Sequence, residues 1–299
     1  MDSESREEIA NRYATKITLA NMLRNSMIVV VKDAEQAYMA ESAGARAVIP
    51  IDKTFNECKA LGGISMVDLE TMENIMESVV IPVIGRVRIG HVLEAMAMEA
   101  AHVNFIEENE LMLSIGDTRI SKHPFKVPFI GEASNLCEAL QRIKEGASMI
   151  RTKYTGDEDR ADIVKTFATV RKVFQEIELV CESDESKLLQ YAAEGMVPIA
   201  LVRMVAQMGK LPVPFFAAGG IFMPIDIAML MSLGCDGVVV SSRAFDVISP
   251  EKRMADIASA LVDYKDSAKM ANIIQRTGGY GKSAGAPKAG PGPGIGPRA

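Results

Sequence analysis

Three side chains of this sequence that could do chemistry lie where apolar runs end, at the points where predicted β-strands would stop. Lys153 closes the run "SMIRTK", Arg86 lies in "VIGRVRIGH", and Glu107 lies in "HVNFIEEN". A lysine amine can form a Schiff base with a sugar carbonyl when burial lowers its pKa. The alternative for Lys153 is an ordinary solvated loop lysine, and the residues alone leave both interpretations open.

A second chemical feature is the glycine pair Gly219 and Gly220 in "VPFFAAGG", directly before a predicted helix. Backbone N–H groups in such a turn, together with a helix N-terminus, favour an anion such as phosphate. Ser241, Ser242 and Arg243 in "VVVSSR" end the next predicted strand and could complete the phosphate site. The alternative is that the glycines serve only tight strand-to-helix turns.

These residues need a scaffold that brings strand ends together. Eight short apolar runs rich in Val and Ile alternate with segments of helical period. Their nearly continuous apolar character is typical of strands covered on both faces. Eight β-α units in about 250 residues predict a (β/α)8 TIM barrel, an α/β fold whose chemistry sits at the carboxyl ends of the strands. An open doubly wound sheet is the alternative, but the G-x-G-x-x-G that it needs after the first strand is missing.

The expected elements can be placed along the chain. The predicted strands cover residues 26–33, 45–51, 81–87, 102–109, 125–132, 148–153, 213–220 and 236–242. Residues 1–16 form a polar N-terminal segment, and the first helix is expected over "TLANMLRNS" (18–26). The barrel is expected to span 17–276, with a helical insert at about 185–210, and the Gly/Pro-rich segment 277–299 is expected to be a disordered tail.

The bulk composition argues against several classes of function. The net charge of −6 and isoelectric point of about 5.3 disfavour a nucleic-acid-binding surface. No apolar run approaches the roughly 18–20 residues needed to cross a bilayer, and the polar N-terminus shows no signal peptide. Four scattered cysteines without a C-x-x-C pattern indicate reduced thiols in a cytoplasmic protein. The three histidines suggest no metal site, and no motif indicates an organic cofactor.

Four stretches carry a resemblance to a known family: "RIGHVLEA", "EGASMIRTK", "KLPVPFFAAGG" and "LMSLGCDGVVV". From about Ile17 to Tyr264 the chain resembles the synthase (lyase) subunit of pyridoxal 5'-phosphate synthase, the PdxS-type family. The resemblance implies a barrel of the ribulose-phosphate-binding type that assembles into hexamers and then dodecamers. Family members condense ribose 5-phosphate, glyceraldehyde 3-phosphate and ammonia, and a partner glutaminase supplies the ammonia.

The resemblance also implies which positions do the chemistry, and here the chain departs from the family. A lysine at the end of strand three holds the sugar covalently in the family, but Arg86 stands at that position. Val30 stands at the aspartate that ends strand one, and Glu107 stands at the aspartate after strand four. Lys153 is retained at the second lysine, which takes over the intermediate at the end of strand six.

The phosphate positions are changed in part. The glycine-rich loop after strand six becomes "RTKYTGDEDRAD", which loses most glycines and gains three carboxylates, Asp157, Glu158 and Asp159. The "GSG" turn after strand eight reads "SSR", with Ser241 for a glycine and Arg243 beside it. The "AAGG" turn remains. Carboxylates repel a sugar phosphate where glycine N–H groups would have bound it.

The substitutions have direct chemical consequences. An imine needs a neutral amine, and the guanidinium of Arg86 stays protonated with a delocalised lone pair. Val30 can neither accept nor donate a proton. We therefore predict no pyridoxal phosphate synthesis by this chain alone. Arg86 is expected either to form an ion pair with Glu107 or Asp52, or to bind phosphate through its two-pronged guanidinium.

Three hypotheses of function follow. The first is a pseudoenzyme that joins active paralogues in a mixed dodecamer and supports vitamin B6 synthesis, as non-catalytic family members of plants do. In this hypothesis the glutaminase and a sugar phosphate are further candidate partners. The second is a repurposed lyase or aldolase that uses Lys153 as its Schiff-base residue. The third is a sensor of phosphate-bearing small molecules that uses "AAGG" and Arg86.

Overall fold

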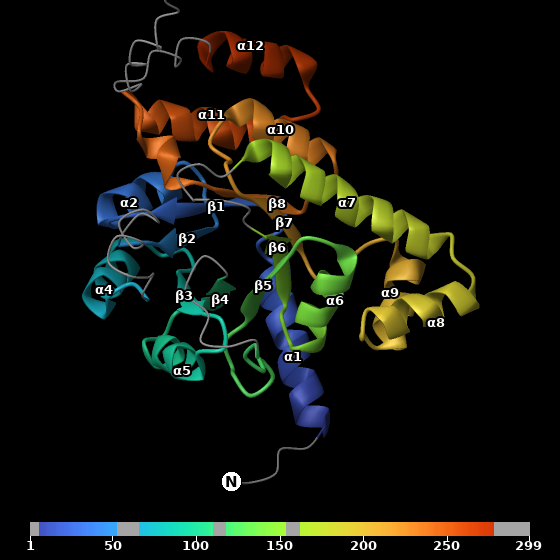
Figure 1. Ribbon diagram of the computed structural model, residues 1–299. Coiled ribbons are helices and arrows are strands. Elements are labelled where there is room, and N and C mark those ends of the chain that lie inside the picture. The colour runs from blue at the N-terminus through green and yellow to red at the C-terminus, as the bar shows by residue number, and fades with distance from the viewer. Residues whose placement is uncertain (1–5, 53–65, 110–117, 154–161, 278–299) are drawn as a thin grey trace, which may run out of the picture.

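Eight parallel strands form one sheet that curls into a barrel (Figure 1). The computed structural model describes residues 6–52, 66–109, 118–153 and 162–277. The strands are β1 (Ser26–Val31), β2 (Ala47–Pro50), β3 (Ile84–Arg88), β4 (Phe105–Asn109), β5 (Phe129–Ala133), β6 (Met149–Thr152), β7 (Phe215–Ala218) and β8 (Gly237–Val240). Their order is β2-β1-β8-β7-β6-β5-β4-β3, and a bridge between Val48 and Val83 brings the first and last strands together. The predicted (β/α)8 barrel is confirmed.

Helices follow the strands and cover the outside of the sheet (Figure 1). They are α1 (Arg6–Asn21), α2 (Ala34–Ser42), α4 (Leu69–Ser78), α5 (Val92–Ala100), α6 (Leu136–Lys144), α7 (Ile163–Cys181), α8 (Glu185–Glu194), α9 (Ile199–Met208), α10 (Pro224–Ser232), α11 (Pro250–Val262) and α12 (Ser267–Thr277). A short 3₁₀ helix, η2 (Ser242–Phe245), follows β8. Among the described residues, no helix is both long enough and apolar enough to cross a membrane.

Side-chain caps define where several helices begin. Asp33 accepts a hydrogen bond from the backbone of Gln36 at 2.8 Å, and Asn135 accepts one from Glu138 at 2.8 Å. Such caps satisfy donors that have no partner inside the helix. Because the capping residues follow β1 and β5 closely, they set the short turns at the carboxyl ends of these strands.

The strands bury both of their faces. One face packs against the helices, and the other lines the interior of the barrel, where an apolar cluster gathers side chains from all eight strands. The cluster contains Ala20, Leu23, Ile28, Val30, Ala47, Ile49, Ile51, Ile84, Phe105, Ile130, Met149, Phe216, Ala218 and Val239. Ala20 and Leu23 belong to α1 and the turn after it, so this segment closes the end of the barrel where the strands begin.

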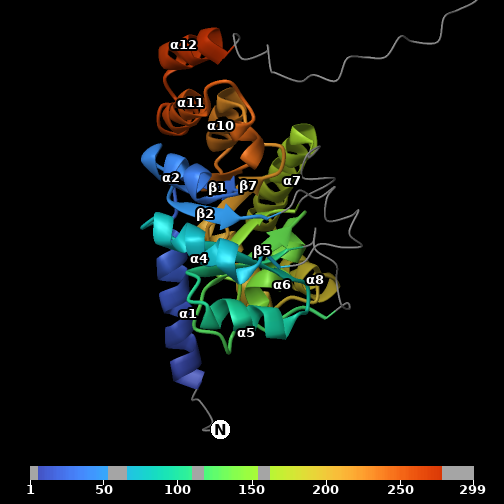
Figure 2. The same cartoon turned by 90° about the vertical axis from the view of Figure 1, so that its left-hand side faces the viewer.

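The first helix differs from the sequence-based expectation. It runs from Arg6 to Asn21 rather than over 18–26, so it includes much of the segment expected to be merely polar. Ser26 already belongs to β1, and Asn25, in the turn between α1 and β1, takes the left-handed conformation with φ of 55°. Figure 2 shows α1 at the end of the barrel where the strands begin, with its N-terminal half extending beyond the body. Few of its side chains are buried, which explains the weak apolar signal.

The helix α12 follows α11 and packs on it and on α10 through Met270 and Ile273, beyond the last helix that the sequence predicted. Residues 278–299, which make up nearly all of the expected tail, lie outside the described residues, as do residues 1–5.

The closure of the barrel by the turn after α1 can be tested by shortening one side chain. Leu23 is 3 % exposed, whereas its neighbour Met22 is 67 % exposed. We expect Leu23→Ala to lower the free energy of unfolding by about 2–5 kcal/mol, because it leaves a cavity at the barrel floor. Met22→Ala is the control and should change that free energy by less than about 0.5 kcal/mol. Equal effects in urea denaturation would contradict this packing.

Candidate functional site

Four neighbouring strands place a chain of opposite charges inside the barrel. Arg86 of β3 donates from Nε to Oε2 of Glu107 of β4 at 2.6 Å. Arg151 of β6 donates from Nε to the other oxygen of Glu107 and from Nη2 to Oε1 of Glu132 of β5. All four side chains are buried. We call this group, Arg86, Glu107, Arg151 and Glu132, the ionic layer.

The register of the strands brings these charges together. Arg86 lies directly beside Glu107 across β3 and β4, and Glu132 lies directly beside Arg151 across β5 and β6. Side chains of a strand alternate between its two faces, so each charge follows an inward-facing apolar residue two positions earlier. Ile84, Phe105, Ile130 and Met149 are those residues. On these four strands, the ionic layer therefore lies one inward-facing position nearer the carboxyl ends than the four apolar residues.

Glu107 is the centre of the ionic layer. Its Oε2 also accepts a hydrogen bond from Nδ2 of Asn109 at 3.0 Å. Burial would raise the pKa of the Glu107 carboxyl, but the charges of Arg151 and Arg86 and the hydrogen bonds from Arg151 and Asn109 outweigh it and lower that pKa to about 2. Glu107 is therefore ionised at neutral pH, and it cannot act there as a proton donor.

The barrel interior around Val30 is apolar. Val30 of β1 is 1 % exposed and packs in the cluster with Ile49, Ala218 and Val239. No group on this side chain can take or give a proton. The structure thus brings Arg86 and Glu107 into contact and leaves Val30 in apolar surroundings. The expected ion pair of Arg86 with Glu107 is confirmed.

Lys153 directly follows β6 and is half-buried. Its backbone N–H donates to the carbonyl of Ala133 at 2.9 Å, which extends the pairing of β6 with β5. Because Lys153 is two residues beyond Arg151, strand alternation places both on the inward face. The carboxylates Asp157, Glu158 and Asp159 of the following loop lie outside the described residues.

The glycine turn after β7 has the geometry that only glycine adopts readily. Gly219 has φ of 111° and Gly220 has φ of 67°. Thr166 of α7 donates its hydroxyl to the carbonyl of Gly219 at 2.8 Å, and Thr152 donates to that of Ala218 at 2.6 Å. The tight-turn interpretation of these glycines is thus sufficient to explain them, and it is compatible with phosphate binding.

The turn after β8 lies next to this glycine turn. The backbone N–H of Ser241 donates to the carbonyl of Ile221 at 2.8 Å, and Ser241 caps η2, which contains Ser242 and Arg243. The guanidinium carbon of Arg243 lies 4.5 Å from the centroid of the Phe222 ring. A cation over an aromatic face is attracted by the ring quadrupole. The candidate residues after β7 and β8 are therefore brought together.

Sequence reasoning missed three residues of this site: Arg151, Asn109 and Thr152. Arg151 is the most important, because it joins two carboxylates that are distant from it in the chain. The alternation Met149, Arg151, Lys153 is the signal that could have found it, since every second residue faces the interior. Among the described residues no group of three or more His, Cys, Asp and Glu side chains could hold a metal ion.

Comparisons with known proteins find a matching family. The model of the SOR/SNZ family matches residues 12–218. Pyridoxal 5'-phosphate synthase subunit PDX1.1 of Arabidopsis thaliana is 41 % identical over 263 residues, which is 87 % of this chain and 84 % of that protein. Pyridoxal 5'-phosphate synthase subunit PdxS of Haemophilus influenzae is 42 % identical over 271 residues, which is 90 % of this chain and 92 % of that protein.

The ionic layer predicts a large cost for removing its central charge. We expect Glu107→Gln to lower the free energy of unfolding by about 3–5 kcal/mol, because two buried guanidiniums lose their shared carboxylate. The same substitution at Glu185, which forms an exposed ion pair with Arg203, should leave that free energy nearly unchanged. Chemical denaturation of both variants measures the difference. A small effect at Glu107 would show that the layer is not paired as described.

The lowered pKa of Glu107 also predicts a pH dependence. Its ordinary value is 4.5 and its value in the folded protein is about 2, so the stability from its ionised form is complete above pH 4.5. That stability is lost as the pH falls toward 2, because the unfolded chain then binds a proton that the folded chain excludes. Between pH 5 and 2.5 the unfolding free energy of Glu107→Gln should therefore fall less steeply than that of the wild type.

Proposed function

The chain belongs to the SOR/SNZ family, and on that premise we propose that it is a catalytically impaired homologue of the pyridoxal 5'-phosphate synthase lyase subunit. In this proposal it has a structural or regulatory role in vitamin B6 biosynthesis in the cytoplasm. It acts by co-assembling with active paralogous subunits in a hexamer or dodecamer. A glutaminase subunit and a sugar phosphate are further proposed partners.

One observation carries the proposal: Arg86, in the middle of β3, is a buried member of an ion pair. The Nε of Arg86 lies 2.6 Å from Glu107, and Glu107 is itself shared with Arg151. A guanidinium keeps its proton and offers no nucleophilic lone pair, so it cannot form the imine that a lysine would form here. In this proposal Arg86 therefore stabilises the barrel interior through its ion pair and does not react with a substrate.

Two further features support the loss of turnover. Val30 removes the acid–base group expected from β1, and its apolar surroundings exclude a charged replacement. Groups that act as a unit in catalysis are strongly non-additive, so losing one nucleophile alone can cost on the order of 10⁶ in rate. Meanwhile the barrel itself is complete among the described strands, and the relatives align with most of the chain. This combination favours a retained scaffold over retained chemistry.

The second candidate function is a Schiff-base lyase or aldolase that uses Lys153. Lys153 is half-buried, lies on the inward face beyond Arg151, and follows the strand whose Thr152 contacts the glycine turn at Ala218. A lysine in such a place could attack a carbonyl if it lost its proton. This candidate differs from the first in requiring a covalent adduct.

The first experiment is intact-protein mass spectrometry after incubation with ribose 5-phosphate, with and without borohydride. We expect no trapped adduct, because Arg86 cannot form an imine. A catalytically active PdxS-type subunit treated in the same way is the positive control. An adduct that disappears in Lys153→Ala would contradict the pseudoenzyme proposal and support the second candidate.

Co-assembly is tested by co-expressing this chain, carrying an affinity tag, with an untagged active paralogue. We expect the two to purify together, and native mass spectrometry should show complexes that contain both chains in variable ratio. Mixing the two after separate expression is the control for exchange during purification. Separate homo-oligomers alone would contradict the proposal.

A further inference from the structure

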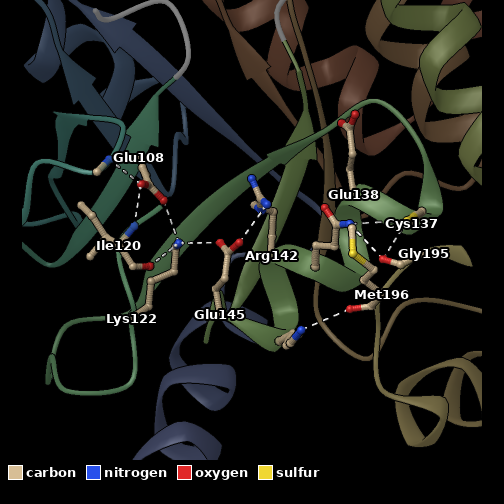
Figure 3. Close-up of polar contacts among 12 residues, drawn as sticks. Glu108, Ile120, Lys122, Cys137, Glu138, Arg142, Glu145, Gly195 and Met196 are labelled. Carbon is tan, nitrogen blue, oxygen red and sulfur yellow. Dashed lines mark hydrogen bonds and ion pairs between the residues drawn. The ribbon is translucent and has the colours of Figure 1, made fainter. Parts of the chain in front are cut away.

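We propose that Lys122 is a buried connector through which the docking of α1 sets the position of the turn after β3. Lys122 is 0 % exposed and lies in the segment between β4 and β5, outside the ionic layer. Its ammonium donates to Oε2 of Glu108 at 2.7 Å, to the carbonyl of Ile120 at 2.9 Å and to Oε2 of Glu145 at 3.0 Å (Figure 3). All three donor sites of the ammonium are thus used.

Toward the mouth of the barrel, the connection continues through Glu108. Its second oxygen, Oε1, accepts hydrogen bonds from the backbone N–H groups of Gly90 and Ile120, each at 3.0 Å. Gly90 belongs to the turn between β3, which carries Arg86, and α5. Glu108 therefore joins that turn to β4 and to the segment that leads into β5. Because Lys122 neutralises Glu108, the position of this carboxylate depends on the lysine.

Toward the floor of the barrel, the same segment holds α1. The buried ammonium of Lys16 donates to the backbone carbonyl of Lys122 at 2.9 Å. The ring of Tyr13 meets the ring of His123 edge to face with centroids 6.0 Å apart, and its hydroxyl donates to the carbonyl of Ala147 at 2.8 Å. The backbone of Lys122 is thus bonded to α1, whereas its side chain is bonded to Glu108.

The connector is braced on its remaining side by α6. The backbone N–H of Lys122 donates to the carbonyl of Glu145 at 2.8 Å, and Nη2 of Arg142 lies 2.8 Å from Oε1 of Glu145. A buried cation with two carboxylates tolerates little displacement, because moving it exposes uncompensated charge. A shift of α1 against the barrel therefore moves Lys122. The carboxylate of Glu108, which accepts from the Gly90 and Ile120 amides, then moves with it. Coupling of this kind acts equally in both directions.

The test is amide hydrogen exchange of the full chain at single-residue resolution, followed by mass spectrometry. The Lys16→Met variant removes the hydrogen bond from Lys16 to the carbonyl of Lys122, but it keeps Lys122 and its two carboxylate partners. We expect the exchange rates of the Gly90 and Ile120 amides to rise about tenfold along with those of α1, since local opening becomes easier. Thr18→Ala, which removes an exposed hydroxyl that donates to the carbonyl of Ala14 in the same helix, is the control and should leave both amides unchanged.

The reverse direction is tested with Lys122→Met, which should speed exchange both at the two amides and in α1. If that variant does not fold, the Lys16→Met result decides by itself. Faster exchange in α1 with unchanged rates at Gly90 and Ile120 would overturn the proposal, as would unchanged rates everywhere in Lys16→Met. The outcome does not depend on whether the chain is a pseudoenzyme.

Discussion

The interior of this barrel depends on one buried carboxylate, Glu107, held between two guanidiniums. A charge removed from water is costly unless it is paired and hydrogen-bonded. Arg86, Arg151 and Asn109 together supply those partners, and Glu132 compensates the second charge of Arg151. The four charges sum to zero across β3, β4, β5 and β6. The charges of the ionic layer are thus balanced within the layer itself.

The two halves of the interior have different characters for this reason. The strands β3 to β6 contribute the ionic layer, whereas β1, β2, β7 and β8 contribute Val30, Ile49, Ala218 and Val239. Chemistry on a carbonyl requires a nucleophile and a proton carrier facing the same space. Here Arg86 and Glu107 form an ion pair with each other, and the other four strands contribute apolar side chains such as Val30 to the interior. What remains toward the strand ends is Lys153 and the glycine turn.

The strand β4 serves two sides of the molecule through adjacent glutamates. Glu107 faces inward and centres the ionic layer, and Glu108 faces outward and receives Lys122 and two backbone amides. Consecutive residues of a strand point to opposite faces, so two neighbouring carboxylates can be buried without repelling each other strongly. The ionic layer and the Glu108–Lys122 contacts, which connect to α1, are therefore separate clusters that share the strand β4.

Much of this protein could be predicted from its sequence. Eight apolar runs with helical segments between them predicted the barrel, and the quoted motifs indicated the family. That Arg86 could not be an imine-forming residue followed from its chemistry alone. The start of α1 could not be predicted, because Lys16, Ala20 and Leu23 become buried only against an assembled barrel. Nor could the sequence show that Arg151 joins Glu107 to Glu132. Those residues are separated by 44 and 19 positions, and only the register and closure of the sheet bring them within hydrogen-bonding distance.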